Sequence, residues 1–131
     1  MISQAHRFHG RNSLRFVYQH GQTVRGGAMA LRFIENSRRQ TWRAAVVVSR
    51  KVSKSAVVRN RIRRRVYEIV REHARQLHQP LDLIFTVYGE DVALLPQTQL
   101  QELVAGLLIK AGAPAPSAPD HAIVEVKETN T

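Results

Sequence analysis

The segment from Ser55 to Leu77 constrains the fold more than any other part of the chain. Its apolar residues recur three or four positions apart, as on one face of an α-helix. They are Val58, Ile62, Val66, Ile69, Val70 and Leu77. Serine is a residue type that caps helix N-termini, and Pro80 stops a helix. We therefore predict one long helix that begins after Ser55, buries this apolar stripe and ends near Leu77.

The other side of this predicted helix is strongly basic. Five of the seven residues from Arg59 to Arg65 are arginines, and only Glu68 and Glu72 follow as acids in the helix. Residues three or four apart are neighbours on a helix, so these guanidinium groups repel one another unless an anion lies against them. A helix N-terminus also favours phosphate. Asn60 adds a donor and an acceptor suited to a base edge or a 2′-hydroxyl. The pattern indicates contact with the phosphate backbone of RNA.

The charge of the whole chain is divided unevenly along the sequence. The net charge is +10, from 20 Lys and Arg against 10 Asp and Glu. Residues 1–75 hold 18 of the basic residues and three acids, whereas residues 76–131 hold two basic residues and seven acids. Solubility alone does not require charge to be confined to one half, so this division favours a polyanionic partner.

Composition also limits the compartment. The chain has no cysteine, which excludes disulfides and fits the reducing cytoplasm. No apolar run approaches the roughly 20 residues that cross a membrane, and residues 1–12 lack the pattern of a secretory signal. We expect a cytoplasmic protein without a membrane partner.

The remaining periodicity predicts an α+β domain over residues 1–112. A single sheet with helices packed on one side is the simplest arrangement. Residues 113–131 are a Pro/Ala-rich, acidic tail that we expect to be disordered. We predict helices at 13–20 and 97–111, and strands at 28–34, 43–49 and 81–88, with one further short strand possible before the long helix.

Several of these segments together resemble the bacterial ribonuclease P protein family. The main match is Ser49-Arg50-Lys51-Val52 followed by Arg59-Asn60-Arg61 on a helix. Leu14-x-x-Val17-Tyr18-x-x-Gly21 is similar to the first helix of the family, and Asp82 to Phe85 is similar to its penultimate strand. The resemblance covers roughly residues 6–112.

The resemblance implies a fold and a function. The family fold is α-β-β-β-α-β-α, a single mixed sheet with a left-handed β-α-β crossover, like domain 2 of the fifth small-subunit ribosomal protein. The family member is the protein subunit of an RNA-based enzyme. It binds the catalytic RNA and the 5′ leader of precursor tRNA, and it promotes endonucleolytic maturation of the tRNA 5′ end. The RNA carries catalysis. We therefore expect no catalytic residue and no metal or cofactor held by the protein alone, Mg²⁺ in the RNA-containing holoenzyme, and one monomeric copy per RNA.

The resemblance also assigns site residues. The expected contacts to the RNA subunit are Arg50, Lys51, Arg59, Asn60, Arg61, Arg63 and Arg64. The expected cleft for the leader contains Leu14, Tyr18 and Arg32. Leu14 departs from the aromatic residue that is usual in the family, but Tyr18 keeps one surface on which a base can stack. Gly26-Gly27 stands where the family often has Asn-Arg.

Three other functional classes compete with this interpretation. A ribosomal or other structural RNA-binding protein shares the size, the charge and the fold class, and it is the main alternative. A DNA-binding regulator would need a base-reading helix and a dimer face. A protein-based nuclease would need clustered acids for Mg²⁺, and the available acids, Asp82, Glu90 and Asp91, occupy positions typical of turns and caps. Three aromatic residues are expected to be packing residues: Phe16, Trp42 and Phe85.

Overall fold

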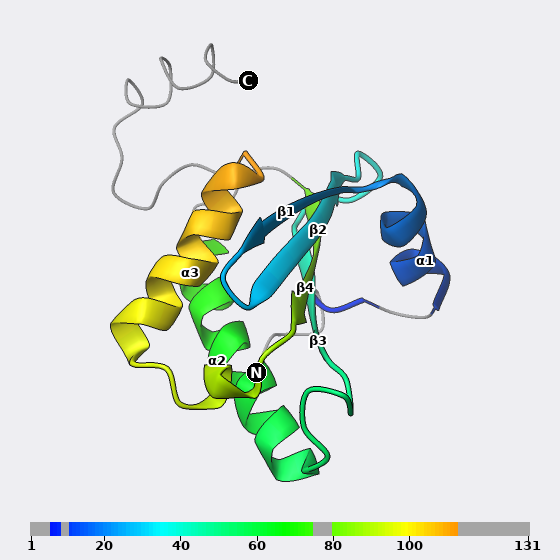
Figure 1. Cartoon of the computed structure of the whole chain (residues 1–131). Coiled ribbons are helices and arrows are strands. Elements are labelled where there is room, and N and C mark those ends of the chain that lie inside the picture. Colours follow the sequence, from blue (N-terminus) through cyan, green and yellow to red (C-terminus); the bar gives the residue numbers. More distant parts are fainter. Residues whose placement is uncertain (1–5, 9–10, 75–79, 113–131) are drawn as a thin grey trace.

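A four-stranded mixed sheet forms the centre of the protein (Figure 1). The computed structural model describes residues 6–8, 11–74 and 80–112. The elements in chain order are α1 (Arg11–His20), β1 (Gln22–Gly26), β2 (Met29–Glu35), β3 (Arg43–Val48), α2 (Ala56–Ala74), β4 (Leu81–Val87), the short 3-10 helix η2 (Glu90–Ala93) and α3 (Gln97–Lys110). The predicted α+β order α-β-β-β-α-β-α is confirmed. The tail and the expected last turn of α2 at Leu77 lie outside the described residues.

The strands lie in the order β1-β2-β4-β3. β2 is antiparallel to β1 and to β4, whereas β3 and β4 are parallel. Parallel neighbours need a long crossover connection, and α2 supplies it between β3 and β4. All residues of β4 except Thr86 are buried, as expected for a central strand that is covered on both faces.

The two faces of the sheet are covered unequally. α2 and α3 cover one face, where Leu31, Phe85 and Val46 pair across three strands in the main core (Figure 1). α1 lies on the opposite face, where it contacts β2 and β4. The prediction that all helices pack on one side is therefore wrong. The second face carries its own small set of buried apolar side chains, which gives α1 a place to bury its stripe: Val17, Ala30 and Ile84.

Strand β1 lies where no strand was predicted. The sequence allowed a further strand only just before the long helix, but the structure has it directly after α1. Of its residues, only Val24 packs against the core, so its apolar signal is weak. The hairpin to β2 turns through Gly27 and Ala28, between the paired residues Gly26 and Met29. Gly27 has a φ of 58°, a value that the first central residue of a tight hairpin needs and that glycine adopts without strain.

No helix in the described ranges is long and apolar enough to cross a membrane.

Candidate RNA interface

The N-terminus of α2 is capped as predicted. The Ser55 hydroxyl accepts a hydrogen bond from the backbone N–H of Val58 at 3.2 Å, and Ser53 in turn accepts one from the N–H of Ser55 at 3.2 Å. The apolar stripe of α2 faces the core through buried residues that include Ile62 and Val66. This orientation turns the outer face of α2 to solvent, with three predicted RNA-binding residues exposed on it: Asn60, Arg61 and Arg64.

Several arginines of the basic run already have protein partners. Arg65 donates hydrogen bonds to the backbone oxygens of Val92 at 2.9 Å and Leu95 at 2.6 Å, so it fastens the η2 segment to α2. Arg59 donates to the backbone oxygen of Ser53 at 2.9 Å. Arg65 and Arg59 therefore each hold a segment outside α2 against the helix.

Arg61 and Arg64 differ from the others. Both are exposed, and neither guanidinium has a hydrogen bond or ion pair with the residues that the structure describes. An exposed ion pair on this helix joins Arg71 to Glu68 at 2.7 Å. The hydrogen bond from Arg71, together with its charge, lowers the pKa of Glu68. Arg61 and Arg64 thus present positive charge to solvent, and no described acid is paired with either of them.

Close to Asn60, one arginine has a local partner. Arg63 is half-buried, and its guanidinium donates a hydrogen bond to the side-chain oxygen of Asn60. This contact occupies one acceptor of Asn60 but leaves its amide N–H groups available to a ligand.

A basic hollow lies at the start of α2. It is lined by Arg50, Lys51, Lys54, Ala56 and Arg59. The first two residues follow the end of β3, so the short β3–α2 loop brings them beside the first turn of the helix. Lys54 was not among the predicted contacts. It stands in the basic stretch 50–54, but only the folded loop shows that it lines the same hollow as Arg59. Four cations around one hollow form a site suited to phosphate.

The three predicted cleft residues lie on and beneath α1. The Arg32 guanidinium donates to the backbone oxygens of Val17 at 3.1 Å and of Tyr18, and to the Thr23 hydroxyl at 2.6 Å. Arg32 therefore ties the last turn of α1 to the sheet. Leu14 is half-buried, whereas the Tyr18 side chain is 44% exposed. Contact between these residues and a leader stays a prediction.

Part of the sheet face beside α1 remains open. The register pairs Thr86 with Ala30 and Val47, which places these residues on the same face as Arg32. Ala45, Val47 and Thr86 are only half-buried. Their small side chains leave this part of the sheet face partly open to solvent, next to the helix that carries Tyr18.

Asp82, one of the acids considered for a metal site, belongs to a buried ion pair. Its carboxylate accepts hydrogen bonds from Arg43 Nε at 3.0 Å, Arg43 Nη2 at 2.8 Å and Asn36 Nδ2 at 3.1 Å. Glu90 and Asp91 lie in the first turn of η2. Residues 6–8, 11–74 and 80–112 contain no group of three or more His, Asp or Glu placed to hold a metal ion.

Two of the three aromatic residues expected to pack do so. Phe85 is fully buried, and Trp42 is buried with its ring stacked on His6 at a centroid distance of 3.9 Å. Phe16 does not follow the prediction, since its side chain is 43% exposed. On α1 it lies next to the buried Val17, so it sits at the edge of the helix–sheet contact.

Comparison with known proteins agrees with this architecture. The family model described as Ribonuclease P matches residues 2–112. The ribonuclease P protein component of Chloroflexus aurantiacus is 39% identical over 117 residues, which cover 88% of this chain and 85% of that protein. The component of a Pseudanabaena species is 35% identical over 85% of this chain and 95% of that protein.

Solved structures show the same fold. A mutant of the Staphylococcus aureus RNase P protein matches with a TM-score of 0.75 at 22% identity, over 85% of this chain and 92% of that one. The RNase P protein from Thermotoga maritima matches with a TM-score of 0.71 at 21% identity, over 79% and 96%. Together with the family model and the relatives, these findings show that the chain belongs to the ribonuclease P protein family.

Proposed function

We propose that this chain is the protein subunit of an RNA-based ribonuclease P. It binds the catalytic RNA through the outer face of α2 and the basic hollow, and it binds the 5′ leader of precursor tRNA beside α1. In this way it promotes cleavage at the mature 5′ end. The RNA carries the chemistry, Mg²⁺ is held mostly by RNA in the holoenzyme, and one monomeric protein copy works in the cytoplasm.

The single observation that carries this proposal is the state of Arg61 and Arg64. Two exposed guanidinium groups stand one turn apart on α2, and no acid among the described residues forms an ion pair with either. Keeping like charges so close costs free energy, which a polyanion removes. Arginine is also the side chain that best matches phosphate, because its planar group makes paired hydrogen bonds.

The leader side of the proposal rests on Tyr18. Its exposed ring lies on a helix that Arg32 fixes to the sheet, next to a low and partly open surface. A ring held in this way offers a stacking platform to an unpaired base, and stacking is tolerant of sequence because every base has a π-face. This tolerance suits leaders that differ from one precursor tRNA to another.

Cleavage of a precursor tRNA at low Mg²⁺ tests the proposal. Three reactions are compared: the purified protein, a bacterial ribonuclease P RNA, and the two together. We expect efficient cleavage at the mature 5′ end only in the mixture. Cleavage by the protein alone would reveal a catalytic site in the chain. A mixture that cleaves no faster than the RNA alone would instead favour a structural RNA-binding protein.

A further inference from the structure

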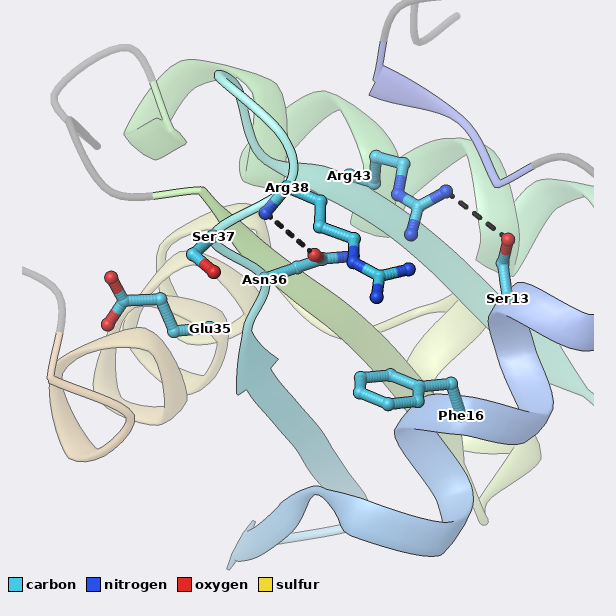
Figure 2. A pocket seen from close by; sticks show the side chains of 7 residues that line it. All are labelled: Ser13, Phe16, Glu35, Asn36, Ser37, Arg38 and Arg43. Atoms are coloured by element: carbon cyan, nitrogen blue, oxygen red, sulfur yellow. Dashed lines mark hydrogen bonds between the residues drawn. The ribbon is translucent and has the colours of Figure 1, made fainter.

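A second hollow lies between α1 and the loop that follows β2 (Figure 2). Its volume is about 410 Å³, within the range of roughly 300–1,000 Å³ that small-ligand sites occupy. On α1 it is lined by Ser13 and Phe16. At about 100° per residue, Phe16 and Tyr18 point to opposite flanks of the helix, with the buried Val17 between them. The hollow is therefore separate from the surface proposed for the leader.

One wall of the hollow is a fixed guanidinium. The Arg43 side chain is only 7% exposed and makes a two-bond contact with Asp82. Its carbon Cζ lies 4.6 Å from the centre of the Phe8 ring, and Nη1 reaches the Ser13 hydroxyl at 3.4 Å, a long hydrogen bond. Arg43 thus lines the hollow without freedom to leave it, and Nη1 keeps capacity for a better acceptor.

A second guanidinium enters the hollow from a braced loop. The backbone N–H of Arg38 donates to Asn36 Oδ1 at 3.1 Å. Asn36 is itself fixed, because its Nδ2 donates to Asp82 and its backbone N–H donates to the Pro80 oxygen at 2.8 Å. Figure 2 shows the Arg38 side chain extending toward the middle of the hollow, with Glu35 pointing away from it. The Arg38 guanidinium has no hydrogen bond or ion pair with any described part of the chain.

The third component is the exposed ring of Phe16. Its ring contact among the described residues is a tilted one with His20, at a centroid distance of 4.8 Å. An unused guanidinium beside an exposed aromatic ring offers one group for a phosphate and one for a base. Both belong to elements that contact the same buried ion pair, α1 through Ser13 and the loop through Asn36.

We propose that this hollow binds one unpaired nucleotide of RNA, with the phosphate held by Arg38 and the base stacked on Phe16. The inference rests on the proposed function, which supplies RNA as the partner. Ser13 and Arg43 complete the polar wall. Such a nucleotide belongs either to the precursor tRNA or to the catalytic RNA, and both present the same phosphate and base.

The test is a double-mutant cycle in the full-length protein. Affinity is measured for the ribonuclease P RNA, and separately for precursor tRNA by the assembled holoenzyme. We expect Phe16→Ala and Arg38→Ala each to weaken one of these affinities about tenfold. Because both residues hold one nucleotide, the affinity of the double variant should fall by a factor clearly smaller than the product of the two single factors. The RNA whose binding changes identifies the source of the nucleotide.

The control is Arg15→Ala, which removes one exposed charge from α1 outside the hollow. When Arg15→Ala is combined with Phe16→Ala, the two factors by which RNA affinity falls should multiply. Phe16→Leu keeps an apolar side chain while losing the stacking surface, and it should behave like Phe16→Ala. Unchanged affinity for both RNAs, or losses that multiply fully in the Phe16/Arg38 pair, would overturn the inference. The proposed function is judged separately by Arg61→Ala with Arg64→Ala, which should weaken RNA binding in either case.

Discussion

The outer face of α2 and the opposite, α1-bearing side of the sheet use arginine in opposite ways. On α2, Arg61 and Arg64 are exposed to solvent and have no hydrogen bond or ion pair with the part of the chain that the structure describes. On the α1 side, Arg32 is bonded to the carbonyl oxygens at the end of α1, and Arg43 is buried against Asp82. Arg32 and Arg43 therefore have structural roles, whereas Arg61 and Arg64, like the exposed Arg38 of the β2–β3 loop, keep guanidinium groups that a ligand can reach. Burial and the available partners decide between these roles.

This comparison predicts the largest loss of stability at the buried pair. Asp82→Ala leaves the Arg43 guanidinium buried without its counter-charge, and the free energy of unfolding should fall by about 3–5 kcal/mol. Urea denaturation measures the change. The double variant Arg43→Met with Asp82→Leu should lose much less, since neither charge remains. A loss below about 1 kcal/mol for Asp82→Ala would show that the pair does not fasten this side of the fold.

Substitutions on the outer face of α2 should change the affinity for RNA rather than the stability of the fold. Arg61→Ala and Arg64→Ala should each weaken affinity for the RNA subunit about tenfold, because a charged hydrogen bond to phosphate is lost. Thermal unfolding of the protein alone should change little, since both side chains are exposed. Arg71→Ala is the matched control on the same helix, where the charge is already paired with Glu68. An equal loss from all three variants would remove the distinction between paired and unpaired arginines.

Tyr18→Ala should separate the two regions functionally. Removing the exposed ring takes away a stacking surface, so the preference of the holoenzyme for precursor tRNA with a longer leader should shrink by several-fold. Affinity for the RNA subunit alone should hold. Measuring the affinity for precursors of graded leader length, beside the affinity for the RNA subunit, checks this. If both affinities fall together, Tyr18 does not belong to a leader site.

The smallest effect concerns the ion pair at the far end of α2. Because the hydrogen bond from Arg71 lowers the pKa of Glu68, the ionised carboxylate contributes stability above its unfolded pKa of about 4.5. That contribution disappears as the pH falls through the folded pKa. Glu68→Gln should therefore unfold at a slightly lower urea concentration than the parent protein at pH 7, and this difference should shrink as the pH is lowered. A difference that persists at low pH would have another origin.

The sequence predicted best where a pattern is local. The apolar stripe of α2 and its Ser55 cap depend on residues within a few positions of each other, and both were found as expected. The role of each arginine was harder to predict from the sequence. Arg65 carries the same charge as Arg64, and only the position of η2, 27 residues away at Val92, makes it structural.

Contacts between distant segments could not be predicted. Arg43 and Asp82 are 39 residues apart, and they meet because β3 and β4 become parallel neighbours. β1 was missed because an edge strand with one core contact has almost no apolar pattern. The exposure of Phe16 could not be predicted either, because it depends on how α1 is rotated on the sheet, which buries Val17 and leaves Phe16 at the edge.

The salt dependence of binding to the RNA subunit tests the central claim most directly. If the exposed arginines of α2 and the basic hollow neutralise roughly six phosphates, affinity should fall about a thousandfold between 50 and 200 mM salt. Each Arg→Ala variant on the outer face of α2 should flatten the logarithmic slope by about one unit. A slope near zero for the parent protein, or a slope that Arg61→Ala and Arg64→Ala leave unchanged, would contradict the claim that this face holds RNA through its phosphates.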